Sequence, residues 1–551
     1  MSEEPLRLEK WSKGYRHPFI VGSVFSGGVG DNPRTLVDLA MSQLSAQLRR
    51  KPEWWMWYSD EKERSLWAIE VSKLPLDVEI PAGINQVSLS SKQIHYVLDE
   101  LDGYAKLRDQ NNQCQVSCFE RIWESDSLID WEILPTLRQD LSKLSKHRPH
   151  PLVTQQLNVS TLINPLLYCL VYGRTLVSVS RGNPPRPVLA PALTDIYSVC
   201  SQFAVLPSDV SISEDGTASF LSYINDLDPD EHRDLYISLG TLLSKSIPLF
   251  EHVLTDLHRN NPLPQRIPGA AHYTVWDEPD PPEHSDDEEG WIKYEINMRN
   301  WVLERPIQLP DVPDSGYSKD LERRRHVVSL KGKRLQVITR LSHLRIKSGQ
   351  PEIQPAWGVE GMRNERVVAC ALHILTCDNI KGSLEFRMAV AYPRGFLPGD
   401  EGATFRTWGL RDGDPCHQYV GSVHLREKLS IAFPNIYQHC LASLDLENPQ
   451  RDGHLITLKF LLVDPEIHPI LSTNNVAPQQ QLWIKKALYQ ALLPRLPAEL
   501  IESIYVLCEG LMSSEEAKEY QTQYEDILTN FNQDSNENYF CVPFDLWIGE
   551  T

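Results

Sequence analysis

A carboxylate and an imidazole in the second half of the chain are the side chains best placed to do chemistry. Glu360 lies in the segment WGVEGMRNE (residues 357–365), and His439 ends the segment FPNIYQH (residues 433–439). Such groups can polarise a substrate carbonyl through hydrogen bonds. A buried glutamate is costly unless it is paired, so a purely structural bridge from Glu360 to His439 or to Arg340 is an equal alternative.

Short β-strands are the elements that must position these groups. From about Val327 to Val463 apolar residues alternate with polar ones, and Arg334–Ile346 is the clearest example. That strand places four residues on one face: Val337, Thr339, Leu341 and His343. Further strands are expected at 366–375, 383–390, 420–424, 429–433 and 455–463. Such spacing, with turn residues between, predicts an all-β sandwich or barrel.

Helical periodicity dominates the first 250 or so residues and returns at the end. Helices are expected after Asn32-Pro33, after Ser90 or Ser91, and from about Glu231 to Ser246. Near the C-terminus, Ser513 and Glu516 fit a capping box. The sequence therefore predicts an α+β protein with a large, mainly helical N-terminal region.

One stretch, Asn260–Glu289, differs in character from both regions. It is rich in proline and ends in the acidic run SDDEE (residues 285–289), which favours a solvated loop. The predicted division is a helical region (1–255), an acidic Pro-rich loop or insertion (256–315), a β-barrel (316–490), and C-terminal helices with a tail (491–551).

Overall charge and composition exclude several classes of function. The 551 residues carry 54 Lys+Arg and 74 Asp+Glu, a net charge of −20, which argues against a nucleic-acid partner. No apolar run is long enough for membrane insertion, and the acidic start does not look like a secretory signal. The ten cysteines are scattered, as in proteins of reducing compartments. We expect a cytoplasmic protein, and the oligomeric state stays open.

Several blocks of the chain, in order, resemble a fungal protein family known only as a domain of unknown function (number 4246). They include LVYGRT (170–175), SYIN (222–225), EHRDLY (231–236) and LVDP (462–465), besides the two segments above. The family's usual Trp-His-Val-Glu-Gly motif is similar to the first half of the iron site of Fe(II)/2-oxoglutarate dioxygenases. The resemblance implies a double-stranded β-helix (cupin-like, jelly-roll) core for the barrel.

At the positions that would bind iron, this sequence departs from the family pattern. The resemblance implies a facial triad of a His, a Glu two residues later on the same strand face, and a distal His. Here the first His is Gly358, while Glu360 and His439 remain as residual ligand positions. Two arginines of the pattern are Cys440 and Leu455. We therefore expect no bound metal and no cofactor, although His373 or His424 could in principle replace the missing imidazole.

Three functions remain open on this basis. The first is a metal-independent enzyme of secondary metabolism, a cyclase (pericyclase, Diels–Alder type) or isomerase that folds a small apolar metabolite in a dry pocket. Its catalytic candidates are Glu360, His439, Asn364 and Tyr437, and its substrate-binding candidates are Trp357, Gly358, Met362 and Leu455. The second is a Fe(II)/2-oxoglutarate oxygenase with a rebuilt site. The third is a non-catalytic ligand-binding or scaffold protein.

Overall fold

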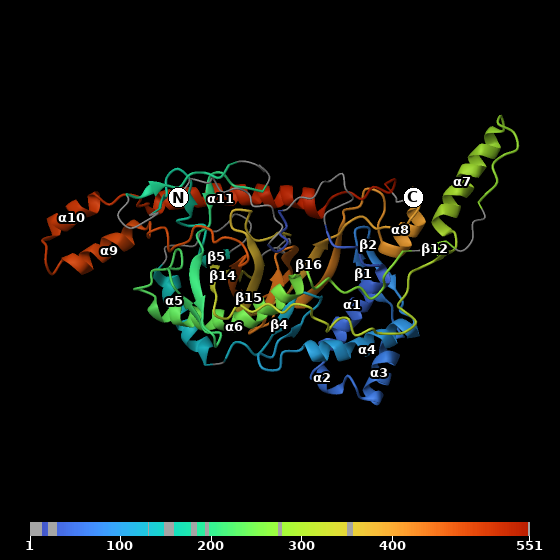
Figure 1. The fold of residues 1–551 in the computed structure, drawn as a ribbon, viewed down its shortest axis with the longest axis horizontal. Coiled ribbons are helices and arrows are strands. Elements are labelled where there is room, and N and C mark those ends of the chain that lie inside the picture. Colours follow the sequence, from blue (N-terminus) through green and yellow to red (C-terminus); the bar gives the residue numbers. More distant parts are fainter. Residues whose placement is uncertain are drawn as a thin grey trace.

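Helices and antiparallel strands are combined in one mixed architecture (Figure 1). The computed structural model describes residues 14–19, 30–130, 132–147, 159–177, 184–192, 198–270, 272–273, 278–349 and 356–548.

A large antiparallel sheet forms the centre of the molecule. Its longest strands are neighbours: β14 (Arg334–Ile346), β20 (Gly453–Val463) and β15 (Val367–Asp378). Most of their residues are buried. In spatial order the strands are β11 (Ala218–Phe220), β10 (Ser208–Ile212), β14 (Arg334–Ile346), β20 (Gly453–Val463), β15 (Val367–Asp378), β18 (Ser430–Pro434), β4 (Trp123–Ser125) and β3 (Gln115–Val116), and β5 (Val159–Ile163) also pairs with β14.

A smaller sheet packs against one face of the large one. Its order is β17 (His417–His424), β16 (Ile380–Ala389) and β19 (Tyr437–Leu446). Between the sheets the rings of Phe386 and Phe433 lie 5.0 Å apart in edge contact. An isolated antiparallel bridge joins Gly358 to His439, so the segment around Gly358 runs beside β19.

The other face of the large sheet is covered by α6 (Arg233–Leu257), whose apolar stripe is buried. His373 of β15 lies on this side, hydrogen-bonded to Ser246 of α6 at 2.7 Å. The two layers and the helix enclose one continuous apolar core.

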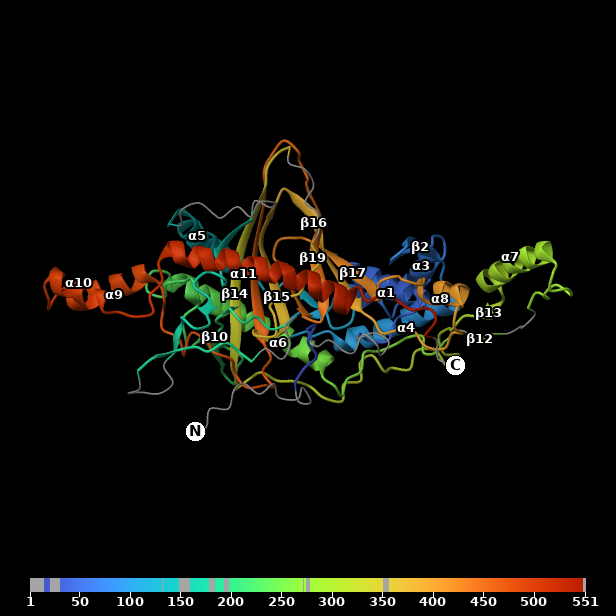
Figure 2. The same ribbon diagram turned by 90° about the horizontal axis from the view of Figure 1, so that it is seen from above.

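Helix α11 (Ser514–Ser535) crosses the strands on the opposite side from α6 (Figures 1 and 2). Its N-cap is Ser513, which accepts a hydrogen bond from the Glu516 amide. Tyr524 anchors the helix because its hydroxyl donates to the buried Glu365 carboxylate at 2.5 Å. A short π-helix, Asn536–Phe540, continues it.

The remaining elements surround this core. Three helices project from its two ends, namely α7 (Glu288–Glu304), α9 (Gln481–Leu492) and α10 (Ala498–Val506) (Figure 1). The others are α1 (Leu36–Arg49), α2 (Trp54–Trp57), α3 (Glu61–Val71), β1 (Leu76–Ile80), β2 (Gly83–Val87), α4 (Ser91–Leu107), α5 (Ile133–His147), β6 (Leu170–Val171), β7 (Leu176–Val177), β8 (Arg186–Pro187), β9 (Phe203–Ala204), β12 (His272–Tyr273), β13 (Ile307–Gln308) and α8 (Glu401–Trp408). Among the described residues, no helix combines the length and the hydropathy needed to cross a bilayer.

Some elements predicted from local sequence patterns are present in the structure, and others differ from the prediction. The strand Arg334–Ile346 is confirmed. Ser90, one of the two predicted cap residues, caps α4 through a capping box with Gln93. The first helix begins later than expected, at Leu36, because Thr35 rather than Asn32 caps it. The region expected to be mainly helical also supplies strands β3, β4, β5, β10 and β11 to the large sheet. Within the predicted loop or insertion at 256–315, the residues that follow Asp287 form helix α7, and Asp287 caps it.

Candidate functional site: a buried carboxylate between two cations

Glu360 and His439, the two residues singled out by the sequence, lie side by side between the sheets. His439 Nε2 is 3.4 Å from Glu360 Oε1, and each side chain is only 8% exposed. Arg340 of β14 also reaches Glu360, with Nη1 3.2 Å from Oε2. Both pairings considered for Glu360 are therefore present.

Lys459 of β20 completes the cluster, and the sequence analysis missed it. Its ammonium donates to Glu360 Oε1 at 2.6 Å and lies 3.2 Å from His439 Nε2. The register explains this, because Lys459 is paired directly with Arg340 across β14 and β20, so both side chains project from the same face. We call Arg340, Glu360, His439 and Lys459 the Glu360 centre.

Asn435, in the turn between β18 and β19, holds the backbone of Glu360 in place. Its Oδ1 accepts from the Glu360 amide at 2.9 Å, and its Nδ2 donates to the Glu360 carbonyl at 2.8 Å. Nδ2 also donates to the Val367 carbonyl at 3.0 Å. This one side chain therefore fixes the carboxylate-bearing segment to the start of β15.

The two cations dominate the electrostatics of the Glu360 centre. Burial would raise the pKa of Glu360, but Lys459, Arg340 and His439 together hold it well below its usual range. Burial and the neighbouring Lys459 lower the pKa of His439, although Glu360 opposes them. With a neutral imidazole and an ionised carboxylate, the two cations leave one positive charge in excess.

Two hydrogen-bonding atoms near the Glu360 centre have no partner within the described part of the chain. His439 Nδ1 is one, and Asn532 Oδ1 of α11 is another. A side chain at Gly358 would face Asn532, since a Cβ built there lies 3.5 Å from Asn532 Oδ1. A side chain at position 358 would therefore point toward α11.

The other catalytic candidates, Asn364 and Tyr437, do not join this cluster through any contact of the described residues. Asn364 accepts from the Cys200 amide and donates to the Cys200 carbonyl, both at 2.8 Å, so it holds a neighbouring loop. Tyr437 is buried with its hydroxyl directed to the Glu120 carbonyl, 3.5 Å away.

The four predicted substrate-binding residues have different surroundings. Trp357 is half-buried under the Arg387 guanidinium, which lies 4.6 Å from its ring. Met362 is part of the core. Leu455 faces the same way as Lys459 but is four residues along β20, about 13 Å at strand spacing. Only Gly358, bridged to His439, is at the Glu360 centre.

Neither of the other histidines considered as replacement ligands is part of the Glu360 centre. His373 is completely buried on the α6 side, where Ser430 and Ser246 hydrogen-bond its two ring nitrogens at 2.8 and 2.7 Å. His424 ends β17 and is exposed. Across the described ranges, no group of three or more His, Cys, Asp or Glu side chains could hold a metal ion.

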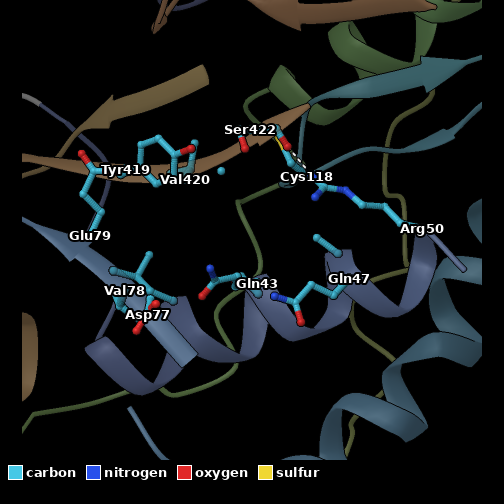
Figure 3. A pocket seen from close by; sticks show the side chains of 14 residues that line it. Gln43, Gln47, Arg50, Asp77, Val78, Glu79, Cys118, Tyr419, Val420 and Ser422 are labelled. Carbon is cyan, nitrogen blue, oxygen red and sulfur yellow. Dashed lines mark hydrogen bonds between the residues drawn. The ribbon is translucent and has the colours of Figure 1, made fainter. Parts of the chain in front are cut away.

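A second feature is a separate pocket of about 130 Å³ beside α1, β1 and β17 (Figure 3). Glu79 and Tyr419 lie at one end and Arg50 and Cys118 at the other. Burial and the Glu385 charge raise the pKa of Glu79. No residue of the Glu360 centre lines this pocket.

Comparison with protein families gives one match: residues 91–487 fit the family described as "Protein of unknown function (DUF4246)". No curated protein matches the sequence.

Similarity to solved structures is low. A selenomethionine-labelled Fe(II)/(alpha)ketoglutarate-dependent dioxygenase, TqaL, is 8% identical, with 64% of this chain and 95% of that chain covered and a TM-score of 0.23. IDO from Bacillus thuringiensis is 10% identical, with 28% and 62% covered and a TM-score of 0.16. The coconut allergen cocosin is 12% identical, with 34% and 36% covered and a TM-score of 0.12. At these TM-scores the similarities assign no fold.

Proposed function

We propose, from the premise that this chain belongs to the DUF4246 family of unknown function, that it is a metal-independent enzyme that isomerises or cyclises a small metabolite. The substrate is largely apolar and carries one anionic group. The observation that carries this proposal is the pair of cations, Arg340 and Lys459, on a buried carboxylate.

The strand order supports a double-stranded β-helix as the scaffold. In a jelly roll the chain passes repeatedly from one sheet to the other. Here β15 leads directly into β16, and β18 leads directly into β19, each step crossing from the large to the small sheet. The Gly358 bridge adds a further segment beside β19.

The residues of this site do not fit the iron centre implied by the resemblance to dioxygenases. A facial triad needs two imidazoles and a carboxylate that are free to donate lone pairs. Gly358 has no side chain, and both oxygens of Glu360 are already engaged by cations. An ammonium has no lone pair to offer a metal and repels it. We therefore assign no step to a metal.

The excess positive charge supports an anionic substrate. The Lys459 and Arg340 side chains are 21% and 28% exposed, whereas Glu360 and His439 are 8% exposed. The two cations are therefore more exposed than the carboxylate that they contact. A carboxylate is the common organic group that a guanidinium and an ammonium recognise together.

Isomerisation or ring closure is the chemistry that these groups can support without a co-reactant. Substrate and product have the same atoms, so no oxidant or reductant is needed. Arg340 and Lys459 can donate hydrogen bonds to an oxygen on which negative charge develops, in a setting drier than water. The protein would lower the remaining part of the reaction barrier by holding the substrate in a folded conformation.

Binding and turnover test the proposal separately. In metal-depleted buffer, sorbate, a dienoic acid, should raise the melting temperature of the protein more than methyl sorbate does. The Arg340→Met variant should lose this difference. A panel of polyene carboxylates should yield a product of unchanged mass and altered NMR spectrum. Equal melting-temperature shifts with sorbate and methyl sorbate would contradict the proposed anion-binding site. Binding of panel members without any isomeric product would contradict the proposed enzymatic activity.

The non-catalytic alternative has one observation in its favour. Glu360 is fully satisfied by protein partners, as a purely structural carboxylate would be. Under that alternative, anions bind but no panel member is converted, and Arg340→Met changes ligand affinity alone.

A further inference from the structure

We infer that the Lys459 ammonium takes the place of a metal cation between Glu360 and His439. This inference concerns the same centre as the proposed function and explains its independence from metal, but it does not require that the centre catalyse a reaction. Its consequence is that removing this ammonium and restoring an imidazole at Gly358 should create a metal site.

The spacing of the two donor atoms carries the inference. Two ligand atoms about 2.1 Å from one ion and about 90–110° apart lie roughly 3.0–3.4 Å from each other. Glu360 Oε1 and His439 Nε2 are 3.4 Å apart. They are therefore placed as neighbouring ligands of one ion would be.

A cation already lies against both donors. Lys459 Nζ is 2.6 Å from Glu360 Oε1 and 3.2 Å from His439 Nε2. Both distances are those of hydrogen bonds and not of coordination bonds. Donation to Nε2 places the imidazole proton on Nδ1, which has no hydrogen-bond partner within the described residues. The ammonium thus uses the lone pair that a metal would need.

Arg340 increases the cost of adding a metal. Its guanidinium lies 3.2 Å from the second Glu360 oxygen, so the carboxylate is already compensated by two positive charges. A divalent ion would enter a site that carries a net positive charge at distances of a few ångströms, where repulsion in a partly dry site is large.

The Gly358 position can accept a histidine. Its φ lies outside the left-handed region, so the backbone suits an L side chain. Directly paired residues of antiparallel segments point to the same side, so an imidazole at 358 would stand beside His439. The neighbouring Asn532 side chain lies 3.5–3.7 Å from a Cβ at this position and must be shortened to make room.

The experiment is a cobalt(II) titration in metal-depleted buffer, followed by visible absorption and calorimetry. The test variant is G358H/N532A/K459M, and its matched control is G358H/N532A, which keeps Lys459. We expect one tightly bound cobalt per chain in the test variant, at least about 100-fold tighter than in the control, and no stoichiometric binding in the wild type. Bound cobalt should also raise the melting temperature of the test variant only.

Two results would overturn the inference. One is stoichiometric cobalt binding by the wild type that Glu360→Gln abolishes. The other is a test variant that is folded by circular dichroism yet binds cobalt no better than its control. If Lys459→Met prevents folding, G358H/N532A/K459Q serves in its place. Failure of the sorbate experiment would reject the proposed function and leave these outcomes unchanged.

Discussion

Gly358 and His439 face each other across two backbone hydrogen bonds of 3.2 and 3.1 Å, so a side chain at position 358 would project to the same side as the His439 imidazole. A Cβ built at Gly358 would lie 3.5 Å from Asn532 Oδ1 of α11. The Lys459 ammonium contacts both Glu360 and His439.

The Lys459→Met substitution should destabilise the protein by about 3 kcal/mol, because it removes one partner of a mostly buried ion pair. Urea unfolding of the wild type and the variant measures this difference. In the Glu360→Gln background the same substitution should cost much less, since the carboxylate charge is gone. Equal costs in the two backgrounds would show that Lys459 and Glu360 are not energetically coupled.

Asn435→Ala should cost about 2–4 kcal/mol and weaken anion binding, since three hydrogen bonds that position Glu360 are lost. Asn364→Ala is the matched control, because it removes a loop-holding amide outside the Glu360 centre. It should lower stability and leave the affinity for sorbate unchanged. Similar affinity losses in both variants would remove the special role given to Asn435.

Tyr524→Phe should loosen α11 from the sheets. The lost hydroxyl leaves Glu365, a carboxyl whose pKa burial raises, with backbone donors alone, at a cost of about 1–3 kcal/mol. Hydrogen exchange should quicken across 514–535. Tyr520→Phe, at a more exposed position of the same helix, is the control, and equal acceleration in both variants would contradict an anchoring role for the Tyr524–Glu365 contact.

Acid should destabilise the fold through His373. Burial lowers its pKa from 6.5 to about 4 in the folded protein. Between these values the unfolded chain binds the proton more readily, so stability present above pH 6.5 is lost as the pH falls toward 4, by at most about 1.4 kcal/mol per unit. His373→Gln should flatten this part of the pH dependence of unfolding, and His424→Gln, at an exposed position, should not. An unchanged slope in His373→Gln would reject this assignment.

Local pattern predicted much of the β region, because strands such as Arg334–Ile346 are long enough to display their alternation. Short strands such as β3 and β4 have no periodicity to detect, so their membership in the large sheet depends on pairing with β18. The resemblance to the DUF4246 family, and not a local pattern, pointed to Glu360 and His439. Lys459 could have been suspected as an inward-facing lysine in an apolar strand, but its partners follow from the register with β14.

Iron retention by the wild-type protein separates a metal-free Glu360 centre from an iron site. The protein is equilibrated anaerobically with Fe(II) and 2-oxoglutarate, dialysed, and compared with the Glu360→Gln variant by elemental analysis. We predict that the two proteins retain the same, substoichiometric amount of iron. One iron per wild-type chain, lost in Glu360→Gln, would contradict the account.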